Sequence, residues 1–274
     1  MYINKKDECE VCMKIGFFDS GVGGLTVLHQ ARKEMPYADF IYFADFENAP
    51  YGEKPKQEVR RLVFDAVDYL AQQKVDAVVI ACNTATSAAI EELRKVYPFP
   101  ILGMEPAIKP ALASIAGQNK HVLVLATSLT LREEKFHQLV DKLNASAIVD
   151  TIPLGGLVQF AEQSDFSSPA IMEYLRNQFK GINKNEYGAV VLGCTHFPLY
   201  IDFIKTFFLP GTQFFDGIDG TIHYLQTILK HKIKAEGQQG QTRFVVTGGK
   251  EWDGILFRAV LDLLSKNQES KPYY

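Results

Sequence analysis

Two cysteines of this chain have closely similar neighbours and could carry out proton transfer together. Cys82 ends the apolar run Ala77–Ala81, and Cys194 ends the run Ala189–Gly193. Polar residues that could begin a helix follow each thiol: Asn83, Thr84, Thr195 and His196. A helix N-terminus lowers the pKa of a nearby thiol, because its unpaired N–H groups favour the thiolate. Two facing thiols could act as bases on either side of a substrate.

Each of these residues also has an ordinary structural interpretation. A single cysteine after an apolar strand is usually a small buried hydrophobe, and His196 could be a structural histidine. The matched surroundings of Cys82 and Cys194 instead indicate two similar halves, each supplying one thiol. His196, beside Cys194, then becomes a candidate acid or base, or a residue that tunes the thiol. The pattern alone does not distinguish a base from a nucleophile.

Two glycine-containing turns could bind an anion. The turn Asp19–Gly24 lacks the Lys-Ser/Thr of a P-loop and the spacing of a dinucleotide site. It could simply be a tight turn that caps a helix, or Asp19 and Ser20 could contact a polar ligand. In Ala49–Gly52, the glycine would let backbone N–H groups approach an anion closely.

Short apolar runs alternate with helical patterns along the chain. The predicted strands are Lys14–Phe18, Phe40–Phe43, Ala77–Ala81, His121–Ala126, Ala147–Thr151, Ala189–Leu192, Gln213–Phe215 and Arg243–Thr247. The predicted helices include Lys56–Gln73, Thr84–Val96, Leu131–Leu143 and Thr221–Lys232. This alternation predicts an α/β fold with mainly parallel sheets. Ligands of such folds bind beyond the carboxyl ends of the strands, which is where the polar residues stand.

The duplicated cysteine motif suggests two halves, residues 14–107 and 108–219. The tail after Gly220 is too short to fold alone and is expected to complete one of the two sheets. The sequence itself does not say which sheet. Residues 1–13 are polar and charged, and we expect a disordered extension rather than a secretory signal.

Bulk composition narrows the class of protein. The chain has 274 residues, 47% hydrophobic and 22% charged, with a net charge of −3. These values predict a soluble globular protein without a basic surface for nucleic acid. No apolar run approaches the ~20 residues of a membrane-spanning helix. Four cysteines in a chain of this length favour a reducing, cytoplasmic location. Cys9 and Cys12 lack a second close pair, so no metal site is predicted.

Five motifs together resemble the glutamate racemases of the aspartate/glutamate racemase family. They are Asp19–Leu25, Pro50–Gly52, Ala81–Thr86, Glu105-Pro106 and Gly193–Leu199. The resemblance implies two pseudo-symmetric α/β domains with the active site in the cleft between them. It places residues 14–107 plus 220–274 in the first domain and 108–219 in the second. It implies interconversion of L- and D-glutamate without a cofactor, to supply D-glutamate for peptidoglycan.

The resemblance also implies roles for individual residues. Cys82 would exchange the α-proton with the D-enantiomer and Cys194 with the L-enantiomer. Asp19 and Glu162 would assist the thiols, and His196 would assist Cys194. The implied substrate contacts are Asp19, Ser20, Pro50, Tyr51, Gly52, Asn83, Thr84, Thr195 and His196, with Thr127 and Thr130 as further polar lining.

Departures from the family pattern leave some alternatives open. Phe46 and Leu154-Gly155 replace residues common in the family, so a racemase for aspartate or another amino acid is the close alternative. A metal or thiol-redox protein using Cys82, Cys194 and His196 is a second class. A non-catalytic amino-acid-binding protein is a third. The sequence leaves the oligomeric state, including a homodimer, and allosteric control undecided.

Overall fold

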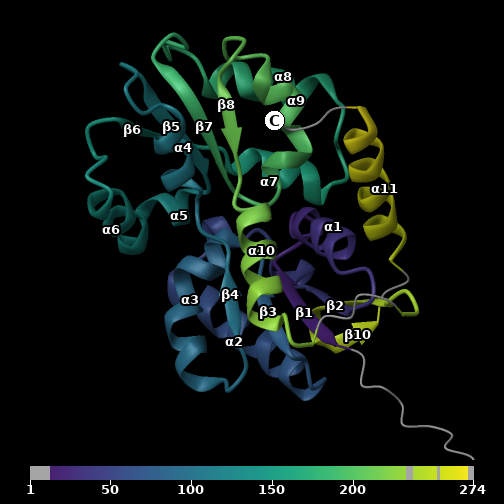
Figure 1. The fold of residues 1–274 in the computed structure, drawn as a ribbon. Helices are drawn as coiled ribbons and strands as arrows, with labels where there is room; N and C mark the ends of the chain where they lie inside the picture. Colours follow the sequence, from purple (N-terminus) through teal and green to yellow (C-terminus); the bar gives the residue numbers. More distant parts are fainter. Residues whose placement is uncertain (1–12, 233–236, 252–253, 271–274) are drawn as a thin grey trace, which may run out of the picture.

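The computed structural model describes residues 13–232, 237–251 and 254–270. Its strands form two sheets, one of six and one of four strands. Each sheet is covered by helices, and the two parts lie one above the other (Figure 1). We call the six-stranded sheet with its helices the first half, and the four-stranded sheet with its helices the second half. Among the described residues, no helix is long and apolar enough to cross a membrane.

The first sheet has the strand order β10-β9-β2-β1-β3-β4 and the second the order β6-β5-β7-β8. All neighbouring strands run parallel except β10 and β9. The strand bounds are β1 Lys14–Asp19, β2 Asp39–Ala44, β3 Ala77–Ile80, β4 Ile101–Gly103, β5 His121–Ala126, β6 Val149–Pro153, β7 Tyr187–Gly193, β8 Gln213–Phe215, β9 Thr242–Val246 and β10 Lys250–Glu251.

The helices connect and cover these strands. Those of the first half are α1 Leu25–Glu34, α2 Lys56–Gln72, α3 Asn83–Val96, α10 Ile218–Leu229 and α11 Ile255–Ser270. Those of the second half are α4 Ile108–Ser114, α5 Ser128–Arg132, α6 Glu134–Lys142, α7 Gly155–Glu162, α8 Pro169–Gln178 and α9 Ile201–Lys205. Short 3₁₀ turns η1 Phe46–Asn48, η2 Tyr51–Glu53, η3 Phe197–Tyr200 and η4 Thr247–Gly249 lie at strand ends.

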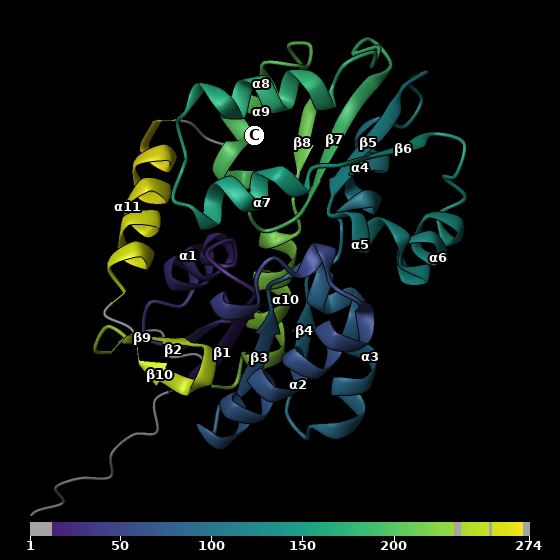
Figure 2. The ribbon, with the colours of Figure 1, turned by 180° about the vertical axis from the view of Figure 1, so that it is seen from behind.

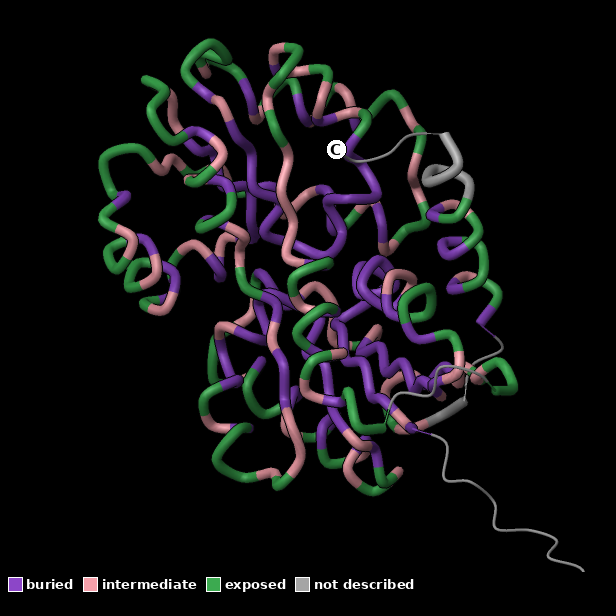
Figure 3. Tube along the Cα trace, viewed as in Figure 1, coloured by how far each residue is buried: buried purple, intermediate pink, exposed green. Residues whose placement is uncertain are grey.

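Both faces of the central strands are buried, which explains their continuous apolar sequences. On β1, Ile15 and Phe17 enter one apolar cluster while Phe18 enters the cluster on the opposite face. Figure 3 shows the resulting buried interior of both halves. The larger cluster also contains Leu125 and Leu192 of the second sheet, so one apolar core continues across the two halves.

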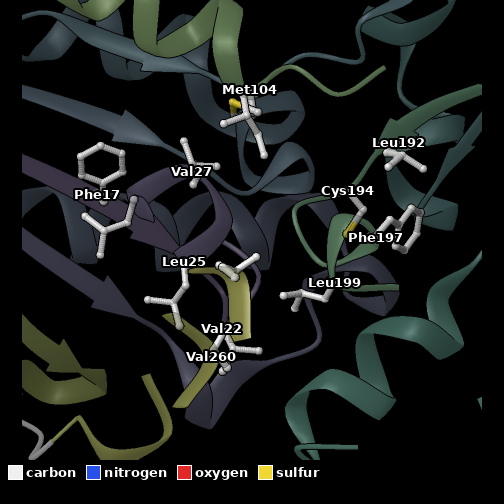
Figure 4. Packing of buried hydrophobic residues seen from close by; sticks show 14 of the residues in the cluster. Phe17, Val22, Leu25, Val27, Met104, Leu192, Cys194, Phe197, Leu199 and Val260 are labelled. Atoms are coloured by element: carbon white, nitrogen blue, oxygen red, sulfur yellow. The ribbon is translucent and has the colours of Figure 1, made fainter. Parts of the chain in front are cut away.

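Cys194 belongs to this shared core. Figure 4 shows its sulfur near Phe197, with Val22 and Leu25 of the first half in the same cluster. The chain that carries this thiol is therefore packed on several sides. Such packing fixes the direction of the side chain at the end of β7.

The predicted α/β fold with mainly parallel sheets is confirmed, with three local differences. Strand β4 was not predicted, because only three residues separate Pro100 from the following turn. Strand β10 is shorter still. The single helix predicted over Leu131–Leu143 is two helices, since the backbone of Glu133 is extended between α5 and α6. In the tail, β9 pairs with β2 of the first sheet. The predicted domain boundaries stay a prediction.

Candidate active site

The two sheets face each other across the boundary between the halves (Figure 2). Residues that follow the carboxyl ends of strands in both sheets line a pocket there. Both thiols line it, and each is nearly buried: Cys82 is 6% exposed and Cys194 is 7% exposed. The remaining lining residues are Ser20, Pro50, Tyr51, Gly52, Glu53, Asn83, Thr84, Thr127, Ser128, Gly155, Val158, Thr195 and His196.

The Cys82 thiol is held in its neutral form. It caps α3, with the N–H of Ala85 donating to Sγ at 3.4 Å. Ser20 Oγ lies 3.8 Å from the same sulfur. Burial, and then the charge of Asp19, raise the pKa of Cys82 to about 12. The helix N-terminus does favour the thiolate, as the sequence suggested, but the cost of burying a charge outweighs it.

Cys194 has a different partner, a histidine held by a carboxylate. His196 Nδ1 lies 3.6 Å from Cys194 Sγ, and His196 Nε2 lies 2.6 Å from Glu162 Oε1. Burial works to lower the pKa of His196, but the hydrogen bonds to Cys194 and Glu162 raise it well above its ordinary value. An imidazolium beside a sulfur stabilises the thiolate. The two thiols therefore have different partners: Cys82 lies near the carboxyl of Asp19, and Cys194 lies beside the imidazole of His196.

Asp19 lies behind the pocket and joins the two halves. Its Oδ1 accepts from the N–H of Gly21 at 3.0 Å, and its Oδ2 accepts from Thr195 Oγ1 at 3.1 Å. Burial raises the pKa of Asp19 to about 6, although the nearby His196 acts to lower it. This carboxyl can thus exchange a proton near neutral pH, close enough to Cys82 to raise the pKa of that thiol.

The glycine-rich turn after β1 is the contact surface for the second half. A Cβ on Gly21 would lie 1.8 Å from Glu162 Oε1, and one on Gly23 would lie 2.4 Å from His196 Nδ1. The N–H of Val22 donates to Glu162 Oε1 at 3.0 Å. These glycines are needed for close approach of the His196–Glu162 pair rather than for phosphate binding.

The turn that contains Tyr51 is fixed in place by a contact within the first half. It begins with a cis peptide bond at Pro50, and Tyr51 OH donates to the buried Asp45 at 2.5 Å. Gly52 faces Thr127 of the second half, where an added Cβ would lie 2.8 Å from Thr127 Cβ. The backbone of this turn is therefore brought to the pocket wall across from α5.

Three threonine hydroxyls form a cluster next to this turn. Thr84 Oγ1 lies 2.9 Å from Thr127 Oγ1 and 3.3 Å from Thr130 Oγ1, and the last two are 3.0 Å apart. Thr84 is at the start of α3 and Thr127 caps α5. Hydroxyls and the free N–H groups at two helix N-termini can donate to a carboxylate.

The structure brings the predicted site residues together, although not all of them line the pocket. Asp19, Glu162 and Thr130 lie behind it and touch residues that line it. The sequence interpretation missed four lining residues, namely Glu53, Ser128, Gly155 and Val158. Glu53 and Ser128 follow predicted site residues directly, which was an available signal. Val158 lies inside α7, where nothing local marked it. The catalytic roles themselves stay proposals.

A metal centre has no support in the described ranges. Within residues 13–232, 237–251 and 254–270, no three His, Cys, Asp or Glu side chains are placed to hold a metal ion. Both described cysteines, Cys82 and Cys194, are free thiols. Cys9 and Cys12 lie outside the described residues.

Comparison with known proteins identifies the family of this chain. The chain has a two-sheet α/β fold, and a thiol follows an inner strand of each sheet. Residues 27–225 match the Asp/Glu/Hydantoin racemase family. Glutamate racemase 2 of Bacillus subtilis is 44% identical over 261 residues, covering 94% of this chain and 98% of that protein. This chain belongs to the Asp/Glu/Hydantoin racemase family.

Solved structures give the same result. Glutamate racemase RacE1 of Bacillus anthracis superimposes with a TM-score of 0.78 at 28% identity, covering 94% of this chain and 95% of that one. The Escherichia coli glutamate racemase, solved with L-glutamate and the activator UDP-MurNAc-ala, gives a TM-score of 0.75 at 28% identity. The match covers 92% of this chain and 94% of that one.

Proposed function

We propose that this protein is a glutamate racemase that moves a proton at Cα with two thiols. The observation that carries the proposal is the pair of thiols lining one pocket, with Cys82 held neutral and Cys194 beside the His196–Glu162 pair. A two-base reaction needs one sulfur charged and the other protonated before each turnover. The family membership and the glutamate racemases among the relatives support this reaction.

With L-glutamate bound, the Cys194 thiolate would remove the α-proton, so that the Cα–H bond breaks and an S–H bond forms. The Cys82 thiol would give its proton to the opposite face, which yields D-glutamate and leaves Cys82 as the thiolate. That state is the starting point for the reverse reaction. Asp19, with its pKa of about 6, is placed to assist proton movement near Cys82.

Negative charge develops on the substrate during the transfer. Fixed donors that strengthen their contacts at that moment lower the barrier, and they do so most effectively where water is excluded. Such donors include the backbone N–H groups at the starts of α3 and α5, at Asn83 and Ser128. The hydroxyls of Thr84 and Thr127 are further donors. We propose that these groups replace the electron-withdrawing cofactor used by other amino-acid racemases. Ser20, Pro50, Tyr51, Gly52, Asn83, Thr195 and His196 would complete the substrate contacts.

The cellular role and domain organisation belong to the same proposal. The D-glutamate would supply peptidoglycan synthesis, and so cell-wall growth and cell shape, from a cytoplasmic enzyme. Residues 14–107 plus 220–274 would form one domain and 108–219 the other. The pairing of β9 with β2 supports the return of the tail to the first domain. A homodimer is compatible with this scheme and is not required by it.

A racemisation assay tests the proposal. Purified enzyme is incubated with L-glutamate or L-aspartate without added cofactor, and the enantiomers are separated by chiral chromatography. We expect D-glutamate to accumulate until both enantiomers are equal. Racemisation of aspartate and not glutamate would assign the alternative substrate. The two-thiol scheme would be overturned if a chelator abolished the activity and stoichiometric zinc restored it.

A further inference from the structure

The junction between α5 and α6 carries two opposite charges that both reach into the first half. Glu133, only 9% exposed, pairs with Lys56 at the start of α2. Lys135 Nζ lies 2.7 Å from Glu105 Oε1, in the segment after β4, and 3.6 Å from Glu91 Oε1 of α3. The Lys135 ammonium is itself shielded from solvent. We call the pairs Lys56–Glu133 and Lys135–Glu105 the charge clasp.

The charge clasp lies next to residues that form the pocket wall. Helix α5 ends one residue before Glu133, and its cap Thr127 contacts Thr84 of the first half. Gly52 packs on the same threonine. Both views show α5 at the boundary between the two halves (Figures 1 and 2). A displacement of the α5–α6 junction would therefore move Thr127 away from Thr84 and Gly52.

The two thiols are almost covered in this arrangement. Cys82 is 6% exposed and Cys194 is 7% exposed, so little solvent reaches the thiols in this arrangement of the two halves. A substrate must enter before the halves close and must leave after they open. Contacts across the cleft that are absent in the open form will set how much of the free enzyme is closed.

We propose that Glu133 and Lys135 are positioning residues whose charge clasp holds the cleft closed around the substrate. The proposal rests on the racemase function proposed above. If only the closed form binds productively, the apparent affinity for glutamate falls in proportion to the closed fraction.

The strength of the clasp follows from its partial burial. Fully exposed ion pairs contribute little, whereas removing one partner of a buried pair leaves an unpaired charge. Glu133 is almost buried while Lys56 is 50% exposed, so the first pair lies between these limits. We expect Lys56→Met to raise KM for glutamate by roughly tenfold, with kcat within about twofold. Lys135→Met is expected to act in the same direction.

The control and the rescue separate the clasp from other effects of charge. Lys54→Met removes the same charge close by, but Lys54 pairs with Glu58 inside the first half, at 2.7 Å. Lys54→Met should leave KM unchanged. An unchanged KM would show that the increase in Lys56→Met does not come from weaker attraction of the anionic substrate to a positive charge. The double exchange Lys56→Glu with Glu133→Lys should recover most of the KM lost in Lys56→Glu alone.

The outcomes distinguish the clasp from the function on which it rests. If wild-type enzyme does not racemise glutamate, the proposed function fails. If wild type is active and Lys56→Met and Lys135→Met keep KM within about twofold, the clasp is wrong while the function stands. A KM increase in Lys54→Met equal to that in Lys56→Met would also overturn it. Circular dichroism and thermal melts verify that each variant is folded.

Discussion

At the scale of single residues, the two thiols differ in what surrounds them. Cys82 has neutral hydrogen-bond partners and the repulsive charge of Asp19. Cys194 has His196, whose pKa is raised by its partners. A symmetric pair of thiols would have no preferred starting state. In the proposed two-thiol reaction, this asymmetry would give the two sulfurs different starting states.

Replacing either thiol should abolish racemisation while the fold is retained. In Cys82→Ala and in Cys194→Ala, one face of the substrate has no proton donor, so we expect kcat to fall by at least ~10³-fold. Cys→Ser should also be severely impaired, because an alcohol is a much weaker acid than a thiol. Chiral chromatography measures the rate. Full turnover in either alanine variant would contradict the paired-base scheme.

Asp19 predicts a particular dependence of stability on pH. Its pKa of about 6 lies above the ordinary 3.8, so between these values the folded protein binds a proton that the unfolded chain has released. The free energy of unfolding should therefore fall as pH rises from ~4 to ~6 and stay lower above. Asp19→Asn should remove about 2–3 kcal/mol of that fall.

Urea unfolding across this pH range provides the measurement. Asp216, whose pKa burial also raises to about 6, keeps its own contribution in the variant, so the curve should flatten without becoming level. Asp65→Asn, on the exposed face of α2, is the matched control and should keep the fall between ~4 and ~6 that Asp19 causes. An unaltered pH dependence in Asp19→Asn would contradict the raised pKa.

At the scale of elements, the position of the pocket residues depends on the turns and breaks between helices and strands. The turn after β1 lets two halves touch through glycine, the break at Glu133 separates α5 from α6, and Cys82 begins α3 as its cap. Each feature places a side chain at a strand's carboxyl end or at the boundary between the halves. These turns and breaks, rather than the lengths of the helices and strands, bring the two thiols to one pocket.

A glycine substitution tests this view of the first turn. In Gly23→Ala the new Cβ would lie 2.4 Å from His196 Nδ1 and 2.5 Å from Thr195 Oγ1. The His196 ring must move away from Cys194, so we expect kcat to fall by roughly 10²-fold or more. Gly220→Ala is the control: its Cβ meets nothing within 4 Å inside α10, and it should gain up to ~1 kcal/mol of stability. Wild-type kcat in Gly23→Ala would contradict the assignment.

The sequence predicted some of these elements and not others, for physical reasons. Strands such as Ala77–Ile80 were predictable because both faces are buried and every position is apolar. The three-residue β4 was hidden because so short a run has no periodicity. The break at Glu133 was missed because no Pro or Gly marks it in the sequence.

At the scale of the whole molecule, the active site exists only because the halves share one interior. The apolar cluster that contains Phe17 also contains Leu192, and the polar network from Asp19 to Thr195 crosses the same boundary. The duplicated cysteine motif predicted both thiols from the sequence. It did not predict their opposite environments or the lining residue Val158, because these arise from contacts between the halves.

The most direct test follows the α-hydrogen when L-glutamate reacts in deuterium oxide. If Cys194 removes the hydrogen and Cys82 delivers another, D-glutamate formed early should carry deuterium while the remaining L-glutamate keeps its protium. Mass spectrometry of the separated enantiomers reads both values in one experiment. D-glutamate that retains the original protium, or L-glutamate that gains deuterium as fast as product appears, would show that a single base serves both faces.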